Sequence, residues 1–148
     1  MPAKTACLRA AIAIPLIAVC AALASAERYH GTVTQVVDGD TLIVRSLDQH
    51  ISVQLEGIDA PDTGEPYAKA AAESLAQLCV QRNADVSSDG SDEYGRVLGT
   101  VRCNGINVNE AQLQRGYAVV QPVANTPSSW QALQGEAQRA HRGLWSPD

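Results

Sequence analysis

The strongest local pattern in this chain is ISVQLEGIDAPD, residues 51–62. Ile51, Val53 and Leu55 alternate with polar residues, and this period of two predicts a half-buried strand. The same parity puts Gln54 on the face opposite the aliphatic side chains. Gly, Pro and Asp follow at once and predict a loop. The sequence therefore predicts a strand that ends in an acidic loop.

Signals on both sides of this strand predict an α+β fold that is mainly β. Strands are expected over 29–37, 41–44, 51–56, 84–88 and 97–101, and helices over 67–80, 108–115 and 129–142. Early strands with one inserted and two trailing helices favour α+β over a parallel α/β sheet. Five short strands and an inserted helix fit a small Greek-key barrel of the oligonucleotide-binding type.

The N-terminus has the features of a secretory signal peptide. Lys4 and Arg9 precede an almost wholly aliphatic run over 10–23, and Ala-Ser-Ala at 24–26 has the small-x-small form of a cleavage site. The run is short for a membrane span. We expect residues 1–26 to be removed, leaving one domain over 27–148 that is secreted or periplasmic, without stable membrane association. A retained N-terminal anchor is the alternative.

Charge argues against binding to nucleic acid by bulk electrostatics. The 148 residues carry a formal charge of −5, and loss of Lys4 and Arg9 with the leader makes it −7. Proteins held on nucleic acid by electrostatics alone are basic. A local basic pocket or a metal-bridged phosphate stays compatible with this charge.

The cysteine content indicates one disulfide. Two of the four cysteines, Cys79 and Cys103, remain after leader removal, and a pair in an exported chain is usually bonded. Closing this loop stabilises a fold by roughly 3–4 kcal/mol in the loop-entropy model. Two separate buried thiols are the alternative. The sequence has no C-x-x-C or H-E-x-x-H motif, so it does not predict a zinc site.

Four aspartates lie near predicted strand ends: Asp38, Asp40, Asp59 and Asp62. Carboxylates and carbonyls from several loops are the ligands of a hard cation such as Ca²⁺. Taken singly, each aspartate is also a good turn residue.

Five ordered blocks carry a more specific signal. They are VDGDTL at 37–42, VQLEGIDAPD at 53–62, DEYGR at 92–96, NVNE at 107–110 and RGLW at 142–145. In order and spacing, from about Tyr29 to Trp145, they resemble the staphylococcal nuclease (thermonuclease) family. The resemblance implies an oligonucleotide-binding-type barrel with three helices and a Ca²⁺-dependent phosphodiesterase that acts on DNA and RNA.

The resemblance also implies a role for each matching residue. Asp40, Asp59 and the carbonyl of Ala60 would hold Ca²⁺, Asp62 stands where the family positions the attacking water, and Arg96 would contact the phosphate. Tyr94 would belong to the nucleotide pocket. A cation and guanidinium groups stabilise the charge that a phosphodiester gathers in its transition state.

This sequence departs from the family pattern at the nucleic-acid side. Gln54 replaces an arginine and cannot form its bidentate fork. Asp62 replaces a glutamate, although Glu65 is an alternative source of the longer carboxylate. Residues 121–123 lack the aromatic side chains that stack on bases. We interpret the chain as a weakened monomeric nuclease, with a catalytically inactive binding module of the cell envelope as the alternative.

Overall fold

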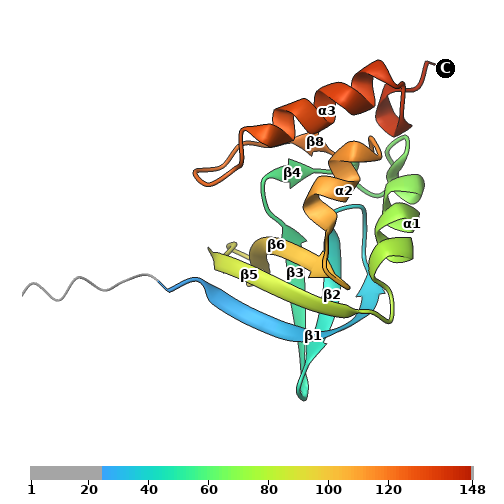
Figure 1. Ribbon diagram of the computed structural model, residues 1–148. Helices are drawn as coiled ribbons and strands as arrows, with labels where there is room; N and C mark the ends of the chain where they lie inside the picture. Colours follow the sequence, from blue (N-terminus) through green and yellow to red (C-terminus); the bar gives the residue numbers. More distant parts are fainter. Residues whose placement is uncertain (1–24, 148) are drawn as a thin grey trace, which may run out of the picture.

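The computed structural model describes residues 25–147, which form a barrel capped by helices (Figure 1). Its main strands are β1 Glu27–Val36, β2 Thr41–Ser46, β3 Gln49–Leu55, β5 Asn83–Ser91 and β6 Val97–Cys103. The helices are α1 Ala68–Cys79, α2 Val108–Gln114, α3 Ser129–Arg139 and the 3-10 turn η1 Gly143–Trp145. The signal peptide expected over 1–26 lies almost wholly outside the described residues and stays a prediction.

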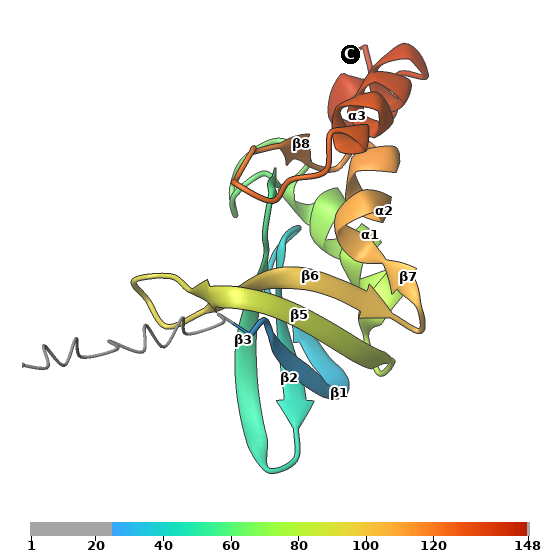
Figure 2. The same ribbon diagram turned by 60° about the vertical axis from the view of Figure 1, so that its left-hand side comes forward.

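The five main strands form a closed mixed barrel. Their order is β3-β2-β1-β5-β6, with antiparallel neighbours throughout. A parallel pairing closes the ring, in which Val53 of β3 lies beside Val97 of β6 and Leu55 lies beside Gly99. Figure 2 shows the β2–β3 hairpin crossing the β5–β6 hairpin. The predicted fold class is confirmed.

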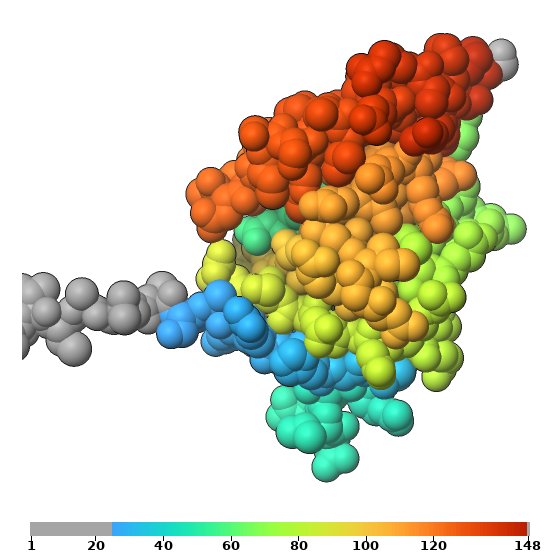
Figure 3. All heavy atoms as spheres, viewed as in Figure 1, coloured from blue at the N-terminus to red at the C-terminus, as the bar shows by residue number. Residues whose placement is uncertain are grey.

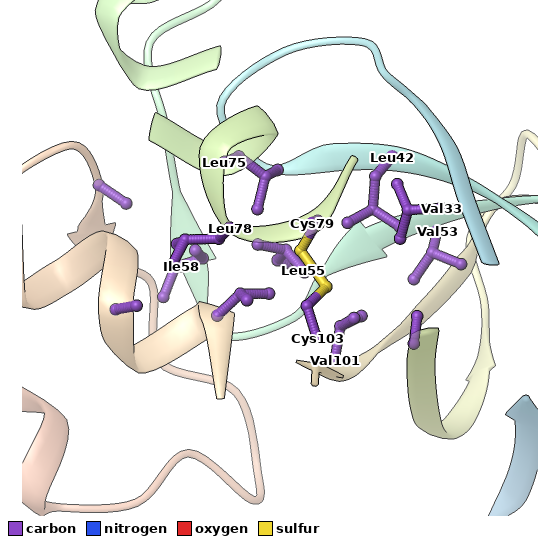
Figure 4. Packing of buried hydrophobic residues seen from close by; sticks show 14 of the residues in the cluster. Val33, Leu42, Val53, Leu55, Ile58, Leu75, Leu78, Cys79, Val101 and Cys103 are labelled. Atoms are coloured by element: carbon purple, nitrogen blue, oxygen red, sulfur yellow. A yellow bond between two sulfur atoms is a disulfide. The ribbon is translucent and has the colours of Figure 1, made fainter. Parts of the chain in front are cut away.

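The core is aliphatic, as expected for a chain without Phe. Inward positions of the strands, including Val33, Leu42, Val53 and Val101, are completely buried. Leu75 of α1 packs into the same cluster, so this helix covers one open end of the barrel (Figure 4). Each buried aliphatic side chain of this kind contributes roughly 1.5–3 kcal/mol of transfer free energy.

A disulfide joins the last residue of α1 to the last residue of β6. The sulfurs of Cys79 and Cys103 are 2.07 Å apart and the Cα atoms 5.3 Å apart. Both cysteines are fully buried in the core (Figure 4). The bond therefore holds the capping helix to the barrel wall.

Short strands beyond the predicted ones position the acidic loop. β4 Ile58–Asp59 pairs with β8 Val119–Val120, and β7 Ile106–Asn107 extends the sheet beside β6. Two-residue strands are too short to show a period in sequence, so the sequence analysis missed them. The β4–β8 pair fixes the loop after β3 against the segment that leads to α3.

The helices beyond the barrel pack on its upper end. Trp130 of α3 is buried and its indole Nε1 donates to Glu110 Oε1 of α2 at 3.2 Å. Within residues 25–147, no helix is long and apolar enough to span a bilayer.

Candidate active site

The site begins at the Asp-Gly-Asp turn between β1 and β2. The backbone N–H of Asp40 donates to Asp38 Oδ1 at 3.1 Å, which closes the turn locally. The Asp40 side chain points inward and the residue is only 6% exposed. Its carboxylate accepts hydrogen bonds from Thr41 Oγ1 at 3.2 Å and from the Ala60 N–H at 2.9 Å.

The bond from Ala60 joins two segments that are far apart in sequence. Ala60 directly follows Asp59, the exposed last residue of β4. The Asp40 carboxylate therefore contacts the backbone next to Asp59, and both aspartates belong to one acidic corner at the end of β3. Burial, with the neighbouring carboxylates of Asp62 and Glu65, raises the pKa of Asp59 above its ordinary value.

Asp40 is a buried acid without a cationic side chain beside it. Burial raises its pKa to about 7, and the carboxylate of Asp38 acts in the same direction. No Lys, Arg or His in the described range 25–147 forms an ion pair with it. A buried carboxylate is costly unless it is paired, protonated or bound to a metal. This observation fits a site for a cation.

The chemistry of the donors fits a hard cation. The carboxylates of Asp40 and Asp59 and the carbonyl of Ala60 are oxygen donors, the type that Ca²⁺ prefers. In the part of the chain that the structure describes, no three His, Cys, Asp or Glu side chains form a complete metal-binding group. Because Ca²⁺ takes about 6–8 oxygen ligands, this donor set leaves the remaining positions to water and substrate.

Close packing holds the Asp-Gly-Asp turn against α1. A Cβ atom added at Gly39 would lie 2.6 Å from the Ala71 Cβ and 2.7 Å from the Ala60 Cβ. Real Cβ atoms do not approach so closely, so only glycine fits between the helix and the acidic loop.

A buried amide from α2 fixes the same turn. Gln112 is fully buried, and its Nε2 donates to the Gly39 carbonyl at 2.7 Å and to the Ala71 carbonyl at 3.0 Å. Its Oε1 accepts from Ser74 Oγ at 2.7 Å, and Arg115 donates to the same hydroxyl at 3.2 Å. Three elements are thus tied together at the carbonyl that precedes Asp40.

The predicted water-positioning residue lies in an exposed turn. The N–H of Asp62 donates to Glu65 Oε2 at 2.8 Å, and the N–H of Glu65 donates to the Asp62 carbonyl at 2.9 Å. The Asp62 side chain is exposed. The Glu65 carboxylate is held at the backbone of Asp62, so both carboxylates lie in the same turn, and the choice between them stays open.

Gln54 lies where parity placed it, on the outer side of β3. It pairs with Thr41 of β2 and with Leu98 of β6, and it is half-buried. It lines a small hollow of about 130 Å³ with Gln121 and Val123. The structure thus places Gln54, the residue that replaces an arginine, beside the loop 121–123, which lacks aromatic side chains.

Arg96 lies in the turn between β5 and β6, directly before Val97, the partner of Val53. Its Nε donates to Asp92 Oδ2 at 2.6 Å, and its guanidinium lies 5.6 Å from the centre of the exposed Tyr94 ring. Although burial opposes it, hydrogen bonds from the Arg96 N–H, the Arg96 guanidinium and the Tyr94 N–H hold the pKa of Asp92 below its ordinary value.

Sequence reasoning missed Gln112 and Ser74, which support the turn from inside. A signal was present, because Gln112 follows Val108 by four positions and so shares its buried helix face. A polar residue on an apolar stripe needs an internal partner. The sequence does not identify that partner, because the partner depends on how α1, α2 and the Asp-Gly-Asp turn pack together.

The fold and the site together define a small closed barrel with an acidic corner after β3 and an arginine in the β5–β6 turn, groups that are suited to phosphodiester chemistry. A family model described as "Staphylococcal nuclease homologue" matches residues 52–147. The chain belongs to the staphylococcal nuclease family, as its sequence blocks indicated.

Several curated relatives bear nuclease names. The chain is 36% identical to an "Uncharacterized endonuclease" of Escherichia coli over 118 residues, which cover 79% of this chain and 77% of the relative. It is 34% identical to a "Micrococcal nuclease" of Shigella flexneri, over 80% of this chain and 74% of the relative. "Protein ParB" of Escherichia coli is 34% identical over 94% of this chain and 84% of its own length.

Proposed function

We propose that this chain is an exported, Ca²⁺-dependent nuclease for DNA and RNA, slowed by Gln54 and Asp62. Family membership supports the nuclease activity. The single observation that favours a cation is the buried carboxylate of Asp40, which has two hydrogen bonds and no cationic side chain beside it. The pair of buried cysteines in a disulfide agrees with an exported protein.

The acidic corner would hold the ion through Asp40, Asp59 and the Ala60 carbonyl. When bound, Ca²⁺ supplies positive charge to a phosphate oxygen and favours ionisation of a water molecule. The role of the chain is to keep the two carboxylates in place before the substrate arrives. The buried contact of Gln112 with the Gly39 carbonyl serves this purpose.

Arg96 would contact the phosphate through its terminal nitrogens. Its Nε is held by Asp92, so the guanidinium plane is oriented before binding. A fixed donor costs less conformational entropy when it binds. Asp62, or Glu65 in the same turn, would orient the attacking water on the side of the phosphorus opposite the leaving group.

The two substitutions weaken this machinery in different ways. The family pattern has two arginines at the phosphate, and with Gln54 this chain has one. The phosphate therefore lacks contact with one full positive charge. Asp62 shortens the carboxylate by one methylene. The chain keeps the acidic corner, so the proposed defect lies in the stabilisation and alignment of the phosphate.

A plasmid-degradation assay of residues 27–148 tests the proposal. We expect slow cleavage with Ca²⁺, no cleavage with a chelator, and no cleavage by Asp40→Ala. Absence of cleavage in all conditions would favour the alternative, a nuclease-fold binding module of the cell envelope. The sequence of the exported form can be checked by N-terminal sequencing, which should begin at Glu27.

A further inference from the structure

A groove lies on the outer face of β1, β5 and β6, apart from the acidic corner. It encloses about 420 Å³. Its polar lining comes from Arg28, His30, Asp85, Ser87, Thr100 and Arg102. Neither the family pattern nor the proposed mechanism uses any of these six side chains.

Strand register explains why these side chains meet. One row across the three strands is Arg28, Ser87 and Thr100, and the next row is His30, Asp85 and Arg102. Successive residues of a strand point to opposite faces, so residues two apart share a face. The intervening residues, such as Val86 and Val101, are buried in the core. The two rows therefore form one solvent-facing surface.

The charge of this surface is positive. Asp85 is the one carboxylate among the lining residues, and its Oδ1 lies 2.5 Å from His30 Nδ1. Neither Arg28 nor Arg102 forms an ion pair within residues 25–147. One terminal nitrogen of Arg102 donates to the Gly105 carbonyl at 3.3 Å, which leaves other guanidinium N–H groups for a ligand. The groove thus places two arginines without ion pairs within one solvent-facing surface of a chain whose formal charge is −5.

Shared lining residues connect the groove to the candidate active site. Thr100 and Arg102 also line an adjacent hollow of about 300 Å³, which contains Glu56 and Val123. These last two residues line the hollow around Gln54 as well. A depression made of these three adjoining hollows thus extends from the arginines to Gln54 on β3. In Figure 3, β1 and β5 lie side by side on this surface, below the loop that precedes α3.

The middle of the depression is acidic, because it is lined by Glu56, Asp89 and Glu110, and the hydrogen-bond donors to Asp89 and Glu110 are uncharged. Glu110 accepts from the Trp130 indole at 3.2 Å, and Asp89 accepts from Asn125 Nδ2 at 3.1 Å. Burial and the charge of Asp89 raise the pKa of Glu56 above its ordinary value. The phosphate-binding capacity is therefore concentrated at the arginine end.

We infer that Arg28 and Arg102 bind backbone phosphates of a nucleic-acid strand whose cleaved bond lies at the acidic corner. The inference rests on the proposed nuclease function, because the strand is its substrate. Guanidinium groups form bidentate hydrogen bonds with phosphate oxygens, and the hydroxyls of Ser87 and Thr100 add donors of the type that usually contacts the backbone. A basic groove that follows the strand is how barrels of this type hold single-stranded nucleic acid. Contact with Arg28 and Arg102 gives the bound strand positive charge, which the uncharged Gln54 does not supply.

The test measures binding rather than cleavage. Residues 27–148 are titrated onto a fluorescent single-stranded DNA of about 16 nucleotides, the upper end of the site sizes for one barrel, in chelator and at several salt concentrations. The variant is Arg28→Ala with Arg102→Ala. The matched control is Arg82→Ala with Arg139→Ala, which removes the same charge from exposed positions on other parts of the molecule.

The groove variant should bind several-fold more weakly at low salt. Its slope of log affinity against log salt should fall by about 1.4, because each lost phosphate contact on a single strand accounts for about 0.7. Arg28→Lys with Arg102→Lys should keep the slope, since the charge is retained. The control should keep a larger slope than the groove variant. Unfolding midpoints of all variants should match the wild type, because these side chains are exposed.

Equal affinities and slopes for the groove and control variants would overturn the inference, and so would a wild-type chain that does not bind the DNA. Binding and cleavage are measured separately, so failure of the groove and failure of the nuclease proposal can be distinguished. If the wild type binds through the arginines and cleaves nothing with Ca²⁺, the groove stands and the proposed activity fails. If it cleaves with Ca²⁺ but the groove variant binds normally, the activity stands and the groove fails.

Discussion

The acidic corner and the phosphate-contacting side of this barrel differ in how well each is built. Around Asp40, a glycine that tolerates no Cβ, a buried glutamine and a backbone N–H from Ala60 fix the geometry. Around Gln54, a half-buried amide lines a small hollow whose lining residues carry neither a positive charge nor an aromatic ring. The residues that would hold the cation are therefore fixed by different contacts from the residues that would bind the phosphate. Each prediction below changes one of the two regions.

Asp40→Ala should have the largest effect, the complete loss of Ca²⁺ binding. Asp40 is the buried ligand of the proposed site. Isothermal titration calorimetry of the wild type should give a Kd of about 10⁻⁴–10⁻³ M, the range of extracellular sites. Asp48→Ala, which removes an exposed carboxylate at the β2–β3 turn, is the control. The same binding heat for Asp40→Ala and the wild type would contradict the site.

Gln54→Arg should raise cleavage more than any other single change at the phosphate-contacting side. One restored transition-state donor is worth about 2.7–4 kcal/mol, or roughly 10²–10³ in rate. Asp62→Glu restores only the reach of a carboxylate and should have a smaller effect. Single-turnover cleavage of a short DNA in saturating Ca²⁺ measures both. The ranking is wrong if Asp62→Glu increases the rate tenfold while Gln54→Arg leaves it unchanged.

The metal-free protein should lose stability as the pH rises. The folded-state pKa of Asp40 is raised to about 7 from 3.8. A raised pKa means that the folded protein binds the proton more tightly than the unfolded chain. The stabilising contribution is therefore complete below about pH 4 and lost as the pH rises through about 7.

Each unit of pKa difference corresponds to roughly 1.4 kcal/mol, so the loss amounts to a few kcal/mol. Urea unfolding in chelator at a series of pH values should show this loss, and saturating Ca²⁺ should remove it. Asp40→Asn should flatten the profile, because an amide does not titrate. An identical pH profile for Asp40→Asn and the wild type would rule out Asp40 as its source.

Gln112→Leu should destabilise the acidic corner and leave the side of the barrel around Gln54 unchanged. The change leaves the carbonyls of Gly39 and Ala71 without their side-chain donor, which costs about 1–3 kcal/mol for a buried polar group. Gln114→Leu makes the same substitution two positions along α2 at an exposed site and should be nearly neutral. Denaturant unfolding gives the free energies, and calorimetry should show weaker Ca²⁺ binding for Gln112→Leu alone. Equal unfolding free energies for the two variants would show that the buried amide is dispensable.

The sequence predicted the barrel from the order of its strands and helices and from the family resemblance, and it predicted the position of Gln54 from local alternation. Val53 and Leu55 point inward, and Gln54 between them points outward, as the period of two requires. Asp40 was predicted as a ligand through family resemblance, since an Asp-Gly-Asp turn alone has no specific meaning. Its burial could not be predicted, because it depends on the packing of Gly39 against α1.

Contacts between segments that are distant in sequence could not be predicted from local patterns. The hydrogen bond from Gln112 to Gly39 joins residues from two elements whose relative placement no local pattern specifies. The ion pair of Arg96 with Asp92 is short in sequence but depends on the conformation of a tight turn. The rows across β1, β5 and β6 likewise require the strand register, which becomes known only when the barrel closes.

The closing seam between β3 and β6 also has a consequence for how the chain folds. Val53 and Val97 are separated in sequence by the whole of α1 and β5. Pairing across so long a loop is slow, because chain entropy is lost before the contacts form. We expect the β2–β3 and β5–β6 hairpins to form early and the seam to form late. Until then β3 and β6 are open edges that can pair with another chain. The disulfide joins Cys79, within that loop, to Cys103 at the end of β6, and so shortens the chain path between β3 and β6. Oxidation before refolding should therefore increase the yield of monomer.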